Sequence, residues 1–194
     1  VFDVAVVGGG ASGASATYHL SRAGLDVVLL DRNDLNTEAS GRNAGSLHGQ
    51  IQHEPFLEEG AEWAEAWLPA LRFLADSLTL WDDLSEDLGT DLQVAKKGGI
   101  LVADDESQLP AIERKVALEN RVGIPSRMLS ADELRSLAPW ISDTVVGGEL
   151  CPIEGKANPL LVAPAFARRA VEAGAVVRTQ TPVVGFDRDG DVRV

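Results

Sequence analysis

Two glycine-centred loops near the N-terminus contain the residues whose types and spacing could do chemistry. The first loop, residues 8–13, reads Gly-Gly-Gly-Ala-Ser-Gly and directly follows the apolar run Phe2 to Val7. Such a loop, between a buried strand and a helix, binds a dinucleotide pyrophosphate, because helix N-terminal N–H groups favour negative charge. Gly8 permits the tight turn, Gly10 leaves room for the pyrophosphate, and Gly13 lets the helix pack closely on the sheet. The sequence therefore predicts a dinucleotide site contacted by Gly8, Gly10, Ala11, Ser12 and Gly13.

An acidic residue follows at the place where a cofactor ribose would lie. The predicted helix, residues 11–23, ends at Gly24, and the apolar run 27–30 leads to Asp31. Asp31 stands 18 residues past Gly13, near the spacing of about 20 that is typical of a ribose-binding carboxylate. A glycine-rich turn in an ordinary βαβ unit is the alternative. The strand before, the helix after and the acid in place favour the cofactor site.

The second loop narrows the cofactor to FAD. A nicotinamide domain would usually continue after Asp31 into another helix and strand, whereas residues 33–50 are polar and aperiodic. A long loop inside a compact domain is usually functional, and successive N–H groups of small residues can bind the polar edge of a flat ring. The predicted contacts are Arg32, Ser40, Arg42, Asn43, Ala44, Gly45 and Ser46. Arg42 could meet a cofactor phosphate or a carboxylate, or could form only a solvent-facing or structural ion pair.

These loops resemble the FAD-dependent D-amino-acid oxidase superfamily, in particular its glycine oxidase and sarcosine oxidase-like branch. The resemblance continues at residues 97–103, 154–159 and 173–183. It implies an α/β fold in which a Rossmann-like FAD-binding domain carries an inserted α+β substrate-domain portion. Residues 1–50 would open the FAD domain, residues 51–150 would form the insertion, and residues 151–194 would return to the FAD domain. Val183, in the return segment, would also contact FAD.

The resemblance implies oxidation of a carbon–nitrogen bond in a small amine or amino acid. The flavin would accept a hydride equivalent, and the imine would then hydrolyse. Such enzymes can work by positioning substrate, so a catalytic base is not required. His48 is the candidate catalytic residue, with a structural role as its alternative. Another FAD-domain enzyme (a hydroxy-acid or glycerophosphate dehydrogenase, or a tRNA-modifying flavoprotein) and a non-catalytic FAD-binding remnant remain alternative functions.

The same resemblance bears on how FAD is attached. In relatives with a histidyl-linked flavin, the linking His precedes an Ala-Ala-Gly-Leu run. Here Arg42 occupies that position, before Asn43-Ala44-Gly45-Ser46. Cys151 matches no known linkage motif and is expected to be a small buried residue. Non-covalent FAD is therefore predicted.

Charge and composition exclude several classes of function. The 194 residues include 30 Asp and Glu against 17 Lys and Arg, a net charge of −13. Residues 51–110 alone hold 14 acidic against 3 basic residues, the pattern of solvated helix faces or of an acidic surface for a basic partner. Nucleic-acid binding needs clustered Lys and Arg, a membrane span needs about 20 apolar residues, and neither pattern occurs. We find no metal-ligand cluster and no secretory signal, and a lone cysteine suits a cytoplasmic location.

Periodicity and turn residues predict the remaining elements. Apolar residues recur at helical spacing over 63–81, a stripe more typical of a core than of a substrate cage, with Pro69 expected to kink or divide that helix. Further helices are predicted over 106–120, after a capping box at 130–133, and over 159–173. Strands are predicted at 99–103 and 176–178, and a hairpin at 182–194 turns at Asp189-Gly190. Because the chain starts without Met and stops inside this hairpin, we expect the N-terminal half of a larger enzyme whose remainder is its partner, with an oligomer possible.

Overall fold

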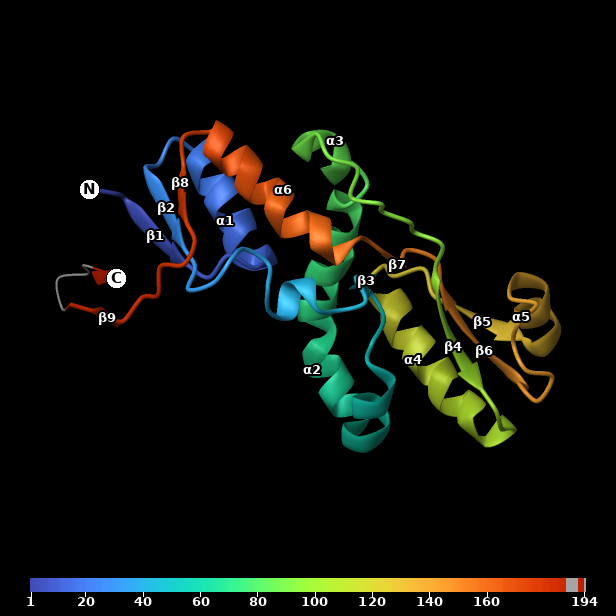
Figure 1. Cartoon of the computed structure of the whole chain (residues 1–194). Helices are drawn as coiled ribbons and strands as arrows, with labels where there is room; N and C mark the ends of the chain where they lie inside the picture. Colours follow the sequence, from blue (N-terminus) through green and yellow to red (C-terminus); the bar gives the residue numbers. More distant parts are fainter. Residues whose placement is uncertain (188–191, 194) are drawn as a thin grey trace. The chain divides into compact units, whose positions relative to one another are not determined.

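The computed structural model describes residues 1–187 and 192–193, and the chain divides into two compact units (Figure 1). The first unit comprises residues 1–45, 83–93 and 157–194, and the second comprises residues 46–82 and 94–156. These limits differ from the predicted segment limits, because residues 83–93 join the first unit and residues 46–50 and 151–156 join the second. The assignment of one unit to the cofactor and the other to the substrate stays a prediction.

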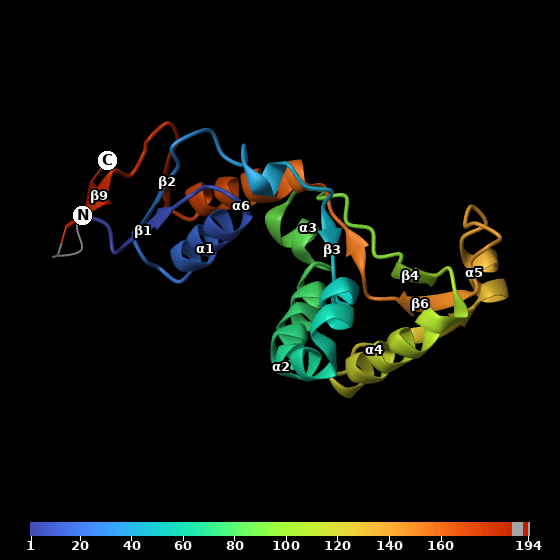
Figure 2. The same cartoon turned by 90° about the horizontal axis from the view of Figure 1, so that it is seen from below.

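A parallel sheet forms the centre of the first unit. Strands β1 (Val4–Val7), β2 (Val27–Leu30) and β8 (Val176–Arg178) pair in the order β1-β2-β8. Helices α1 (Ala11–Arg22) and α6 (Pro159–Glu172) lie side by side against this sheet in both views (Figures 1 and 2). All four residues of β2 are buried, because that strand has a partner on each side and helices over it. This is the βαβ arrangement that the N-terminal pattern predicts.

Strand β1 corrects one expectation. The sequence predicts a buried strand over residues 2–7, but β1 covers only Val4–Val7 and alternates between half-buried and exposed residues. Val7 has an exposed fraction of 53%. The reason is that β1 lies at the edge of the three-stranded sheet formed by the part of the chain that the structure describes.

The second unit combines an antiparallel sheet with helices. Strands β4 (Gly99–Ala103), β5 (Arg127–Ser130) and β6 (Gly147–Cys151) pair in the order β4-β6-β5. The sheet packs against α4 (Leu109–Arg121), which in turn contacts α2 (His53–Leu80) (Figure 2). The short strands β3 (Ser46–Leu47) and β7 (Gly155–Lys156) form a separate antiparallel pair. The remaining short elements are η1 (Ala39–Gly41), α3 (Leu84–Leu88), η2 (Glu106–Gln108) and α5 (Ala131–Leu137).

Helix α2 confirms the predicted apolar stripe but not the predicted break. Leu71 and Leu78 are buried, whereas Leu74 has an exposed fraction of 38%. The rings of Trp63 and Trp67 stack with centroids 6.1 Å apart and pack against the core cluster that contains Leu71. The helix continues through Pro69, whereas the backbone leaves helical geometry at Gly60, with φ 81°. Glycine reaches this left-handed region without a Cβ clash, so the irregularity falls at the glycine rather than at the proline.

Cap residues act as the sequence predicts. Ser130 and Glu133 form both hydrogen bonds of a capping box, and Asn158 accepts a hydrogen bond from the Leu160 N–H at the start of α6. Cys151 is buried, and burial raises the pKa of its thiol to about 11. Strand β9 (Gly185–Phe186) pairs antiparallel with β10 (Val192–Arg193), while the predicted Asp189-Gly190 turn lies outside the described residues. Among the helices that the structure describes, none has the length and apolarity to cross a membrane.

Candidate functional site

The glycines of the first loop hold the backbone in a form that other residues would disrupt. Gly8 has φ 101°, a conformation that favours glycine. A Cβ on Gly13 would overlap the carbonyl oxygen of Gly8, so α1 begins in direct contact with the end of β1. A Cβ on Gly10 would lie 2.7 Å from Ser40 Oγ. The loop is therefore closed by backbone contacts that depend on the absence of side chains.

Ser40 joins the two predicted loops. Its Oγ accepts a hydrogen bond from the Ala11 N–H at 3.1 Å, at the N-terminus of α1. The positive end of this helix faces the same place, because its first N–H groups have no partner within the helix. The two loops, 29 residues apart in sequence, thus meet where an anionic group is best stabilised.

Asp31 braces the glycine loop from the end of β2. Its Oδ2 accepts a hydrogen bond from the Gly9 N–H at 2.5 Å, and its Oδ1 accepts one from the Asn33 N–H at 2.7 Å. A carboxylate offers about four lone-pair sites, so Asp31 keeps acceptor capacity for the two hydroxyls of a ribose. The predicted ribose contact fits this geometry and stays a prediction.

A cavity of about 400 Å³ opens beside these groups in the first unit. Its walls come from the glycine loop, the end of β2, the second loop and the return segment after β8. Six of the predicted contacts line it: Gly8, Gly10, Asp31, Arg32, Ser40 and Val183. The cavity combines a close backbone approach, a helix N-terminus and a carboxylate, which are the groups that bind the adenosine and pyrophosphate portion of a dinucleotide.

Asn36 also lines this cavity, and sequence reasoning missed it. Its backbone has φ 64°, its Nδ2 donates to the carbonyl oxygen of Pro159 at 2.8 Å, and its Oδ1 is buried without a hydrogen-bond partner among the described residues. An unpaired buried acceptor costs free energy, and the burial of Oδ1 keeps it out of reach of a ligand in this conformation. The available signal is an asparagine inside an aperiodic loop, because asparagine tolerates positive φ.

The predicted contacts at residues 42–46 belong to the second loop and do not line the cavity. Asn43 Nδ2 donates to the carbonyl oxygens of Ala39 and Ser40, and Asn43 Oδ1 accepts from the Gly45 N–H at 2.7 Å. Arg42 is exposed and forms an ion pair with Glu38, with 3.7 Å between Arg42 Nη1 and Glu38 Oε2. Cofactor contacts stay predictions for all fourteen of the predicted contact residues. Eight of the fourteen do not line the cavity: Ala11, Ser12, Gly13, Arg42, Asn43, Ala44, Gly45 and Ser46.

His48 belongs to a second cavity, which lies within the second unit and has a volume of about 610 Å³. Its imidazole is exposed, and His48 Nδ1 lies 3.7 Å from Glu154 Oε1. Polar residues that share the cavity wall include Gln50, His53, Lys115 and Glu154. Burial lowers the pKa of His53, and the charge of Lys115 acts in the same direction. A cavity with polar side chains on one wall can orient a small substrate.

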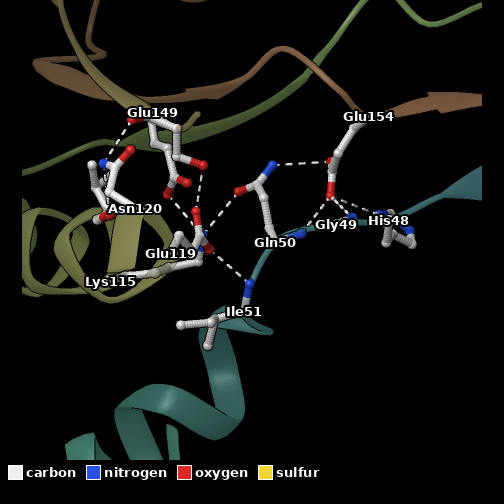
Figure 3. A network of polar contacts seen from close by, with 11 residues as sticks. His48, Gly49, Gln50, Ile51, Lys115, Glu119, Asn120, Glu149 and Glu154 are labelled. Carbon is white, nitrogen blue, oxygen red and sulfur yellow. Dashed lines mark hydrogen bonds and ion pairs between the residues drawn. The ribbon is translucent and has the colours of Figure 1, made fainter. Parts of the chain in front are cut away.

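Lys115 connects this wall to a buried ionic cluster (Figure 3). Lys115 Nζ donates to Gln50 Oε1 at 2.9 Å and to Glu119 Oε1 and Glu149 Oε2 at 2.7 Å each. Lys115, Glu119 and Glu149 each have an exposed fraction of at most 1%. Sequence reasoning missed this cluster, because single charged residues in α4 and β6 look like ordinary surface positions. Only the spacing of Lys115 and Glu119, four residues apart, indicates a pair.

The cluster binds a proton that an ordinary glutamate would release. Burial raises the pKa of Glu149 to about 8, the hydrogen bond and charge of Glu119 add to the rise, and Lys115 opposes it. Glu149 Oε1 is buried and has no hydrogen-bond partner among the described residues. With its proton, Glu149 adds no negative charge to the cluster at neutral pH.

The stability of the protein should therefore fall as pH rises through this window. The folded state keeps a proton on Glu149 that the unfolded chain loses near the ordinary pKa of 4.5. The contribution of Glu149 to the free energy of unfolding is fully present below pH 4.5 and is lost progressively up to about pH 8. Glu149→Gln removes the titration while keeping the shape. Both proteins are unfolded with urea at pH 5, 6.5 and 8. The free energy of unfolding of the variant, relative to that of the wild type, should rise at each step. A difference that stays constant with pH would contradict the assignment.

Replacing Asp31 tests the ribose contact. Asp31→Ala should weaken FAD binding by about 1–3 kcal/mol, the cost of leaving buried polar groups unpaired. Asp34→Ala is the matched control, because Asp34 is exposed and is not part of the cavity wall. Titration of the full-length apoprotein with FAD measures both affinities. Equal affinities for wild type and Asp31→Ala would refute the contact.

Comparisons with known proteins identify the family of the chain. A family model described as "FAD dependent oxidoreductase" (DAO) matches residues 3–194. One of the subunits of opine oxidase from Rhizobium meliloti is 29% identical over 187 residues, which covers 91% of this chain and 47% of that protein. One of the subunits of anaerobic glycerol-3-phosphate dehydrogenase from Escherichia coli K12 is 26% identical over 97% of this chain and 32% of its own length. The chain thus spans less than half of each of these curated relatives.

A solved structure gives the same result for the fold. Glycine oxidase from Bacillus cereus superposes with a TM-score of 0.73 at 28% sequence identity. The match covers 96% of this chain and 48% of that one. The α/β architecture is therefore that of a flavoprotein, and the chain corresponds to about half of it.

Proposed function

Because the chain belongs to the FAD dependent oxidoreductase family, we propose that it forms part of an enzyme that oxidises the carbon–nitrogen bond of a small amine or amino acid. FAD, when bound, supplies the electron acceptor for such an oxidation. The observation that carries the cofactor half of this proposal is the cavity of the first unit, where both glycine loops and Asp31 meet.

Residues of the first unit would hold the adenosine and pyrophosphate end of FAD. The Ala11 N–H already donates to Ser40, so the N–H groups that follow it in the first turn of α1 would face the pyrophosphate, Gly10 would allow the close approach, and Asp31 would accept from the ribose. These residues bind and orient, and none of them needs to exchange a proton with substrate.

The cavity of the second unit supports an amine over a phosphate ester as substrate. All three hydrogens of Lys115 Nζ are used by Gln50, Glu119 and Glu149. The backbone N–H groups of residues 49–51 are also used, each by a glutamate carboxylate. Phosphate binding relies on such cationic and backbone donors, and these donors of the cavity wall are already committed.

Oxidation of glycerol-3-phosphate is the second candidate, because one relative is named as a dehydrogenase of that substrate. Anaerobic flavin bleaching separates the two. The full-length flavoprotein is mixed with sarcosine, glycine, proline or glycerol-3-phosphate, and the loss of visible flavin absorbance is followed. We expect reduction by at least one amine and none by glycerol-3-phosphate. Reduction by glycerol-3-phosphate alone would replace the proposal with the second candidate.

FAD should be held without a covalent bond, because Arg42 stands where the linking histidine of some relatives would be. Acid precipitation of the full-length flavoprotein should release all of the yellow colour to the supernatant. Flavin that stays with the washed pellet would contradict this prediction, and tryptic mapping of the yellow peptide would then identify the linking residue.

A further inference from the structure

Two buried carboxylates hold three consecutive backbone N–H groups beside the second cavity. Glu154 Oε1 accepts from the Gly49 N–H at 2.6 Å and from the Gln50 N–H at 2.9 Å. Glu119 Oε1 accepts from the Ile51 N–H at 2.7 Å. The segment between β3 and α2 therefore has each of these donors fixed by a charged group, which makes stronger hydrogen bonds than a neutral acceptor.

The Gln50 side chain connects the two carboxylate systems, and its orientation is determined by chemistry (Figure 3). Lys115 Nζ can only donate, so Gln50 Oε1 must face it, at 2.9 Å. Gln50 Nε2 then faces Glu154 Oε2 at 3.0 Å, and Glu154 must accept. The direction of every hydrogen bond from Lys115 to Glu154 is thus fixed by the ammonium group.

Glycine at position 99 makes room for this arrangement. A Cβ on Gly99 would overlap Glu154 Oε2 and would lie 2.9 Å from Gln50 Nε2. Gln50, Gly99, Lys115 and Glu154 line the cavity together with His48. The network is therefore part of the cavity wall itself and also the support for its loop.

We propose that Gln50 and Glu154 are positioning residues for substrate oxidation, because together they fix the wall formed by His48 to Ile51. This inference rests on the proposed function, since it assumes that substrate enters this cavity. Displacing a positioning group by about 1 Å can cost on the order of 100-fold in rate even without touching the reacting atoms. The geometry points to an effect on turnover that exceeds any effect on flavin content.

Glu154→Gln is the first test, because it keeps the shape and breaks the direction of the chain of hydrogen bonds. A glutamine at 154 can still accept from the Gly49 and Gln50 N–H groups, but its amide nitrogen then faces the amide nitrogen of Gln50. Flipping Gln50 would turn that nitrogen toward the Lys115 ammonium. We expect kcat/KM per bound flavin to fall about 10- to 100-fold. Glu58→Gln is the matched control, since Glu58 is exposed in α2 and is not part of this cavity wall.

The double variant Gln50→Glu with Glu154→Gln is the decisive test. The glutamate at 50 accepts from Lys115 with one oxygen and from the amide nitrogen of residue 154 with the other. The amide oxygen of residue 154 then accepts from the two backbone N–H groups. Every hydrogen bond between Lys115 and the loop is therefore restored, and the Lys115 ammonium still only donates. We expect kcat/KM per flavin to return to within about threefold of wild type, a cost of about 0.6 kcal/mol.

The measurements use full-length flavoprotein and whichever substrate reduces the wild-type flavin fastest. A failure of the proposed amine oxidation would therefore appear in the wild type, separately from a failure of the positioning role. Unchanged kcat and KM per flavin in Glu154→Gln would overturn the positioning role. A folded double variant as slow as Glu154→Gln would overturn it as well. If Glu154→Gln does not fold, the double variant decides, with wild-type kinetics supporting the proposal and slow turnover refuting it.

Discussion

Lys115→Met should lower the free energy of unfolding of the full-length protein by about 3–5 kcal/mol. Removing one partner of a buried ion pair leaves an uncompensated charge in the interior, and here Glu119 loses its ammonium while Glu149 loses a hydrogen-bond donor. The methionine fills a similar volume, so the loss reports charge and hydrogen bonding rather than a cavity. Urea unfolding at pH 7 is the measurement.

Arg114→Met provides the control for this variant. Arg114 is the preceding residue of the same helix and is exposed, and no ion pair of its side chain occurs among the described residues. A surface substitution of this kind usually changes stability by less than about 0.5 kcal/mol. Equal losses in the two variants would mean that the cluster contributes nothing specific.

Gly13→Ala should weaken FAD binding about 10- to 100-fold. The added methyl group would overlap the Gly8 carbonyl oxygen, and forcing extra atoms into a packed site costs about 1–3 kcal/mol. Alanine has a better helix propensity than glycine by about 1 kcal/mol, so a net loss identifies the clash and not a helix effect. Ala16→Ser, at an exposed position of α1, is the control, and FAD titration of the apoprotein measures all three proteins. Wild-type affinity for Gly13→Ala would show that the loop can relax.

The structural features that the sequence predicts correctly depend on residues that lie close together in the chain. The βαβ unit, the caps at Ser130 and Asn158, and the helix ends at glycine follow from backbone chemistry that acts within a few residues. The family motifs likewise lie in short contiguous loops. Such features need no knowledge of what packs against them.

The missed part depends on tertiary contacts. The exposure of β1 depends on which strands lie beside it. The cluster of Lys115, Glu119 and Glu149 requires α4 to pack on β6, and Lys115 and Glu149 are 34 positions apart. Pro69 predicts a break that the structure has at Gly60 instead. A proline raises the local free-energy cost of continuing a helix, but the sequence does not show whether tertiary packing outweighs that cost.

The second loop of the first unit holds itself together, and this decides where the effects of mutations should appear. The Asn43 side chain hydrogen-bonds to the backbone of its own turn. Gly41 packs against the backbone oxygen of Asn36, and Gly45 packs against that of Ala157, with no space for a side chain at either glycine. The conformational entropy of ordering this loop is lost when the chain folds and not when the cofactor arrives. Substitutions that loosen the loop should therefore appear first as lower stability of the apoprotein and slower FAD association, while the rate at which bound FAD leaves changes less.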